Sequence, residues 1–334
     1  MAMTSLAFGD GQQGDEGFKP ERATTLSEAE ARACLDHESM LSFNRLETIS
    51  PTSAAIIARH KHGVELNALT TIDPPTAAAL ARASTYLAMN GLARVDQKSA
   101  EALAMCNAPL RLEGLEDLSS VPLAVRLAKQ RAVRLPKIQA LAGPVLEAMC
   151  SVPCDLYLPG VVNLQPNAAM ALRKHQGVLD LENLQNPPPH VLECILGNQG
   201  AVCLGSVAQL GVPPPPAVLA ALTRHHGSLC LNGLRDLAHA EAAAIRGRTG
   251  QTDLWGITNL RLPVADALVN CNGTIWLMGV ENMGPDVVAT LLKHRPRLGT
   301  GFVFPVTLRA NLAAEDVVAF EKHEGIHFGH EDLP

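Results

Sequence analysis

The side chains of this sequence that are best suited to chemistry are its cysteines and histidines. Cys150 and Cys154 form the one close pair among eight cysteines. The spacing of the others lacks the regularity of a disulfide framework, which favours free thiols in a reducing compartment. His323, His327, His330 and Glu331 suit zinc chemically, but their spacing matches no helical metal pair. We therefore expect no metal site.

No motif in the chain predicts catalysis. A glycine-rich phosphate loop ending in Gly-Lys-Ser/Thr, a GxSxG elbow, an HExxH pair and a CxxC pair are all missing from the sequence. The cysteines fall on repeated positions, which indicates packing. We expect no catalytic residues, no cofactor and no enzyme activity.

The remaining informative residues belong to a repeat. Leu112, Leu135, Leu158 and Leu181 follow one another at 23-residue intervals, and the series extends over most of the chain. Around Leu181 apolar and polar residues alternate, as in a strand with one buried face, and a short helix opened by prolines follows. Such a unit cannot bury its own apolar side, so the units must stack into a solenoid.

The pattern LxLxGLxxL, followed by an alanine-rich helix that ends in H-x-G, is clearest in residues 228–250. It resembles the bacterial leucine-rich repeat in its 23-residue form, over roughly residues 40–328. The resemblance implies a right-handed α/β horseshoe of about 12 repeats, with a parallel sheet on the concave face and short helices on the convex face. The asparagine that usually follows the strand is replaced by leucine, which predicts an apolar turn. The leucines concerned are Leu46, Leu69, Leu92, Leu115, Leu184 and Leu234.

A second apolar column passes through the expected helices, from Ile57 to Val318, and Arg126 interrupts it. A one-residue shift that turns Val125 or Leu127 inward would explain this arginine. Histidines recur near the C-terminal ends of the expected helices, where a positively charged side chain would interact favourably with the negative end of the helix dipole. These are His60, His175, His225 and His323.

The chain divides into four expected parts. Residues 1–22 are rich in Gly, Gln and Asp, which predicts a disordered N-terminus. Residues 23–39 should form a helical cap that opens with Ser27 and Glu30 as a capping box. Residues 40–328 form the solenoid, and residues 329–334 form a C-terminal tail.

Composition limits the partners and the compartment. The net charge of −6 argues against a dominant electrostatic grip on nucleic acid. No apolar run reaches the length of a membrane span, and the N-terminus lacks the pattern of a secretory signal. We expect a cytoplasmic monomer; secretion without a cleavable signal peptide is the alternative.

The concave face is the expected binding surface. Its first third is polar, its middle is charged, and its last third is apolar, with both tryptophans in consecutive repeats. Clustered Trp and Met side chains on a surface mark interfaces, although the C-terminal cap could instead cover them. The predicted partner contacts are Arg111, Arg134, Tyr157, Asp180, Glu182, Asp253, Trp255, Trp276 and Met278.

These observations favour a non-catalytic scaffold that binds a protein or peptide on its concave face. Two alternatives stay open at this point. The first is a secreted bacterial effector that recruits host proteins through the same array, and the second is a self-assembling structural protein.

Overall fold

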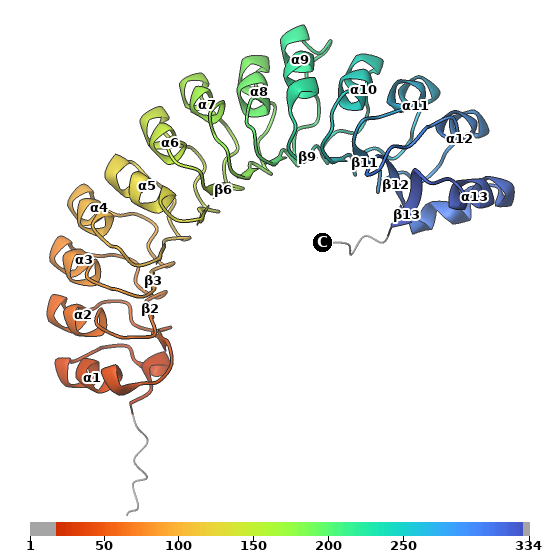
Figure 1. The fold of residues 1–334 in the computed structure, drawn as a ribbon. Coiled ribbons are helices and arrows are strands. Elements are labelled where there is room, and N and C mark those ends of the chain that lie inside the picture. Colours follow the sequence, from red (N-terminus) through yellow and green to blue (C-terminus); the bar gives the residue numbers. More distant parts are fainter. Residues whose placement is uncertain (1–17, 330–334) are drawn as a thin grey trace, which may run out of the picture.

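The computed structural model describes residues 18–329, which form one open arc of repeated strand–helix units (Figure 1). The strands line the concave side and every paired strand is parallel to its neighbour, while the α-helices form the convex side. This is the α/β solenoid that the repeat predicts. Within the described residues the arc holds thirteen strands and thirteen α-helices.

The helices and strands follow one another in strict alternation from β1 onward. The α-helices are α1 (Glu28–Ala33), α2 (Pro51–Ile57), α3 (Pro74–Leu80), α4 (Gln97–Ala104), α5 (Val121–Ala128), α6 (Gly143–Met149), α7 (Pro166–Leu172), α8 (Pro189–Leu196), α9 (Pro216–Arg224), α10 (His239–Arg246), α11 (Leu262–Leu268), α12 (Pro285–Leu291) and α13 (Ala314–Glu321). The strands are β1 (Leu41–Ser42), β2 (Val64–Glu65), β3 (Leu87–Ala88), β4 (Leu110–Arg111), β5 (Ala132–Arg134), β6 (Asp155–Tyr157), β7 (Leu179–Asp180), β8 (Val202–Cys203), β9 (Leu229–Cys230), β10 (Thr252–Asp253), β11 (Thr274–Trp276), β12 (Gly301–Pro305) and β13 (Ile326–Gly329). Three 3-10 helices complete the described chain, namely η1 (Pro20–Arg22), η2 (Cys34–Asp36) and η3 (Val306–Asn311).

The N-terminal helix α1 packs against α2 and begins with the predicted capping box. Ser27 caps α1, and Glu30 completes a capping box, because Glu30 N donates to Ser27 Oγ and Ser27 N donates to Glu30 Oε2 at 2.8 Å. The expected disorder of residues 1–22 falls mainly outside the described residues. Within them, η1 already places Pro20 in a buried position.

The apolar columns of the repeat become one continuous core. Leu112, Leu135 and Leu158 are all buried, and so are the six leucines predicted to form apolar turns after their strands. The expected helix column is wrong at its last member, because Val318 is 46% exposed whereas Phe320 is fully buried. The reason is aromatic packing at the C-terminal end, where the Phe320 ring lies 6.0 Å from Phe304 and 6.2 Å from Phe328.

A column of buried polar side chains runs along the ends of the helices. His60 Nε2 lies 3.0 Å from the carbonyl oxygen of His37, and His225 Nδ1 lies 3.0 Å from that of Asn198. In both pairs the acceptor belongs to the preceding unit. His60, His225 and His323 therefore each bind a backbone carbonyl of the preceding unit, which is a more specific role than the helix-dipole interaction expected from the sequence. His175 differs, because its Nε2 lies 3.3 Å from the carbonyl oxygen of Val178, three residues later.

The concave sheet is not continuous. It consists of a four-stranded sheet, β1 to β4, and a nine-stranded sheet, β5 to β13. The uninterrupted sheet that the repeat predicts is therefore wrong at one place, between β4 and β5. The helices α4, α5 and α6 nevertheless remain packed in sequence across this position.

The buried histidines predict a pH dependence of stability. Burial lowers the pKa of His175, His225 and His294 below the ordinary value. These histidines therefore bind protons less readily in the folded chain than in the unfolded chain. Their contribution to the free energy of unfolding is present above about pH 6.5 and is lost as the pH falls. We expect the urea midpoint to be flat above neutrality and to fall below it.

His225→Asn should flatten this dependence, since Asn198 occupies the same position one unit earlier. His239→Asn, on the exposed side of α10, is the control and should leave the curve unchanged. A urea midpoint that rises as the pH falls would contradict the assignment of this pH dependence to the buried histidines.

Candidate functional site

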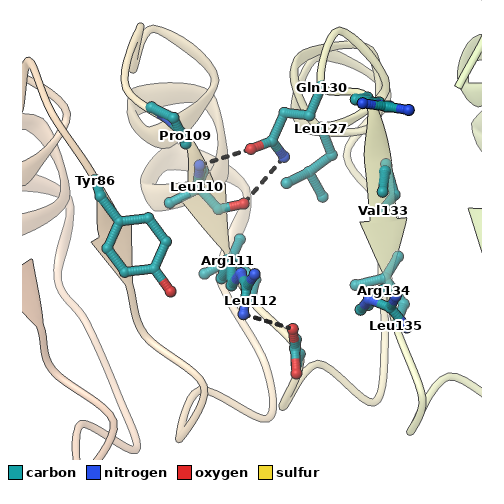
Figure 2. Close-up of a pocket in the computed structure, with 13 residues that line it drawn as sticks. Tyr86, Pro109, Leu110, Arg111, Leu112, Leu127, Gln130, Val133, Arg134 and Leu135 are labelled. Atoms are coloured by element: carbon teal, nitrogen blue, oxygen red, sulfur yellow. Dashed lines mark hydrogen bonds and ion pairs between the residues drawn. The ribbon is translucent and has the colours of Figure 1, made fainter. Parts of the chain in front are cut away.

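The break between β4 and β5 is built around the side chain of Gln130. Its Oε1 accepts from Leu110 N at 2.7 Å, and its Nε2 donates to Leu110 O at 3.0 Å (Figure 2). Elsewhere in the first sheet these bonds come from the next strand; for example, Leu87 N donates to Pro109 O. The carboxamide of Gln130 thus replaces one peptide group of the missing strand neighbour.

Arg126 explains why this repeat differs. In α4 the buried helix positions are Ala100 and Leu103, whereas in α5 Leu127 is 2% exposed and Arg126 is only half-buried, so the helix is shifted by one residue. The Arg126 guanidinium donates to the carbonyl oxygens of Cys106 and Ala108 in the preceding repeat. We attribute the separation of the two strands to this shift, together with the polar side chains between the repeats.

The break leaves a cleft of about 290 Å³ on the concave side. Arg111 and Arg134 line it from the facing edges of the two sheets, and both side chains are exposed (Figure 2). Arg134 lies over the Tyr157 ring, with 4.0 Å from its guanidinium carbon to the ring centroid. Arg111 lies 5.7 Å from the Tyr86 centroid and 3.7 Å from a carboxylate oxygen of Glu113. Planar guanidinium groups held in this way suit a carboxylate or phosphate group.

The acidic part of the predicted face lies farther along the arc. Asp180 on β7 and Asp253 on β10 are half-buried, whereas Glu182 is exposed. Burial is the main cause that raises the pKa of Asp253 above its ordinary value. The predicted charged residues therefore form two regions, a basic one at the break and an acidic one on β7 to β10.

The apolar end of the face differs from the prediction. Trp255 is 39% exposed and Trp276 is half-buried, but Met278 is only 5% exposed, so the expectation of a surface methionine there is wrong. The neighbouring concave position on β12, Pro305, is buried as well, which shows that the last repeats enclose this column. The Trp276 Nε1 atom is buried without a hydrogen-bond partner among the described residues.

The described residues contain no group of three or more His, Cys, Asp or Glu side chains placed to hold a metal ion. The histidine-rich group at residues 323–331 lies partly outside them. All eight cysteines are described and all are free thiols. Between residues 18 and 329, no helix has the length and apolar character needed to cross a membrane.

The stacked units, the parallel concave sheet and the convex helices together define an α/β solenoid, the architecture that the resemblance to the leucine-rich repeat implies. No family model matches the sequence, and no curated protein matches it. Among 42 matching chains of solved structures is the leucine-rich-repeat protein LIC12759 of Leptospira interrogans. It is 14% identical, with a TM-score of 0.49 over 94% of this chain and 83% of that chain. The architecture is established by the repeats of the chain itself and not by this likeness.

Sequence reasoning placed Arg111, Arg134 and Tyr157 on the concave face but missed Gln130 and Tyr86. It treated the face as one row of equivalent strands, so it could not identify a residue that substitutes for a strand. The available signal was Arg126, whose place in the apolar helix column marks the repeat that fails to pair.

Gln130→Ala should expose the edge of β4. The loss of two hydrogen bonds is expected to lower the free energy of unfolding by about 1–3 kcal/mol. Hydrogen exchange at the Leu110 amide should accelerate, because Gln130 Oε1 accepts that proton.

The matched control is Gln176→Ala, at the equivalent position two units later, where the side chain is exposed. This variant should leave both measurements unchanged. Equal exchange rates at Leu110 in the wild type and in Gln130→Ala would show that the carboxamide does not protect β4.

Proposed function

We propose that this chain is a non-catalytic scaffold that binds a protein or peptide on its concave face. The architecture supports this proposal, because curved solenoids offer an extended concave surface that suits binding of a macromolecular partner. The fold alone does not determine which partner is bound; the residues on the concave surface do. The composition of that surface therefore decides which partner we expect.

The observation that carries the proposal is the pair of exposed arginines at the sheet break. Arg111 and Arg134 lie on opposite edges of the same cleft. Arg134 stacks on Tyr157, whereas Arg111 pairs with Glu113 near the Tyr86 ring. These contacts restrict the guanidinium groups before a partner arrives, so less conformational entropy is lost on binding. Glu113 is the one acidic side chain that lines this cleft. We expect an acidic side chain or a chain-terminal carboxylate of the partner to enter here.

Trp255 supplies the second expected contact. It is exposed on the concave side, and large aromatic side chains often contribute much of the energy of an interface. A partner that spans from β4 to β10 would contact the arginine pair at one end and Trp255 at the other.

Replacement of Arg111 and Arg134 by glutamate tests the basic contact. The wild-type chain should enrich peptides rich in Asp and Glu from a displayed random-peptide library, and the enrichment should weaken as salt is added. Arg111→Glu combined with Arg134→Glu should reduce the affinity for an enriched peptide at least tenfold, an expected loss of about 1.4 kcal/mol or more.

The control is Arg224→Glu combined with Arg246→Glu, which changes the net charge equally on the exposed sides of α9 and α10. It should bind as the wild type does. An equal loss in both double variants would reveal a general charge effect, and the cleft would no longer be the binding site.

Fluorescence tests the contact at Trp255. The chain has two tryptophans, so Trp276→Phe leaves Trp255 as the single indole reporter. An enriched peptide that covers Trp255 should shift its emission to shorter wavelength, since water is removed from the ring. Trp255→Ala should weaken binding of the same peptide, whereas Leu262→Ala, an exposed residue on α11, should not. Binding without any change in emission would remove Trp255 from the interface.

A further inference from the structure

Two cysteines face each other on neighbouring strands of the concave sheet. Cys203 ends β8 and Cys230 ends β9, and the parallel register pairs these two residues directly. Adjacent strands lie about 4.8 Å apart. This separation falls within the roughly 4.4–6.8 Å between Cα atoms that a disulfide spans. Both side chains alternate with buried residues, so both project to the same side and both are half-buried.

The arc brings these side chains closer together than a flat sheet would. The strands lie on the inner side of the curve (Figure 1). On the inner side of such a curve, side chains that project away from the core on neighbouring strands must converge. Asp180 on β7 and Asp253 on β10 border the pair in the same register. The resulting row of carboxylate, thiol, thiol and carboxylate lies across the surface proposed for partner binding.

The two thiols act on each other more strongly than on their surroundings. Their mutual interaction is the largest cause that raises the pKa of Cys203 and the largest cause that lowers the pKa of Cys230. Asp180 and Asp253 oppose ionisation of the neighbouring thiols. The other close pair behaves differently, because burial raises the pKa of Cys150 to about 12 and that of Cys154 to about 11. Within the pair, the interaction favours ionisation of Cys230 over that of Cys203.

We propose that Cys203 and Cys230 form an oxidisable dithiol, which a hydroperoxide converts into a disulfide between β8 and β9. The Cys230 thiolate attacks the terminal oxygen of the hydroperoxide, and the O–O bond breaks. Cys230 becomes a sulfenic acid, and the departing oxygen takes up a proton. The Cys203 sulfur then attacks the Cys230 sulfur and releases water. For hydrogen peroxide, two thiols and one oxidant molecule give one disulfide and two water molecules.

Such a bond would alter the concave face chemically without rearranging the arc. It would join two strands that are already paired and would remove two thiol groups between Asp180 and Asp253. It would also link the two ends of the segment between Cys203 and Cys230, which contains four consecutive prolines at residues 213–216. The proposal is independent of any partner, because its chemistry needs only the chain and an oxidant.

The test treats the full chain with hydrogen peroxide, blocks the remaining thiols with an alkylating agent and maps peptides by mass spectrometry without reduction. The expected result is a cross-linked peptide joining Cys203 to Cys230, two hydrogen masses lighter than the separate peptides. Reduction should restore both thiols. Overturning results are a Cys150–Cys154 bond formed in preference, or separate sulfinic acids at Cys203 and Cys230.

Single variants identify the order of the steps. In Cys203→Ser the oxidised Cys230 has no thiol to resolve it, so it should be trapped by dimedone. In Cys230→Ser, Cys203 should remain largely unmodified at the same dose. The control, Cys150→Ser combined with Cys154→Ser, should still form the cross-link. Circular dichroism verifies that each variant is folded, and equal dimedone labelling of Cys203 and Cys230 would contradict the proposed roles.

Discussion

The structure depends on the contact between each repeat and the next. A unit of 23 residues exposes one apolar side that only a neighbouring unit can cover, so the core is a sum of interfaces. Strand pairing adds backbone hydrogen bonds at the same contacts. Close backbone approach adds a further restriction, since a Cβ atom on Gly114 would lie 1.9 Å from the carbonyl oxygen of Asn90. Shape, curvature and the presentation of the concave face all follow from this repeated contact.

Polar side chains pair with buried backbone atoms at several of these interfaces. His60 and His225 bind carbonyl oxygens of the preceding units, and Arg248 makes three hydrogen bonds to backbone carbonyl oxygens. The Gln130 carboxamide likewise pairs with the backbone N and O of Leu110 on β4. The solenoid is therefore stabilised by an apolar core together with a chain of side-chain-to-backbone bonds.

The periodicity of the sequence was sufficient to predict the solenoid, the buried columns, the capping box at Ser27 and the shift that turns Leu127 inward. These features depend on neighbours at fixed spacing, which a sequence displays directly. The gap between β4 and β5 depends on how one altered helix displaces one strand, and spacing alone carries no measure of displacement. Met278 was misjudged for a related reason, since alternation indicates which side a residue faces but not what the last repeats enclose there. The positions of Arg111 and Arg134 were predictable, whereas their union in one cleft was not.

The helical layer continues past the place where the sheet is interrupted, and this gives the arc an uneven stiffness. At every other junction, bending the molecule strains backbone ladders as well as helix packing. At this junction the side chains of Gln130 and Arg126 take the place of a strand ladder, so the inner rim resists stretching least there. The arc can open or tighten at this point with the smallest elastic cost, and such a change would alter the spacing of the two arginines. The arc is thus most easily deformed at the cleft between β4 and β5, where an acidic partner would bind.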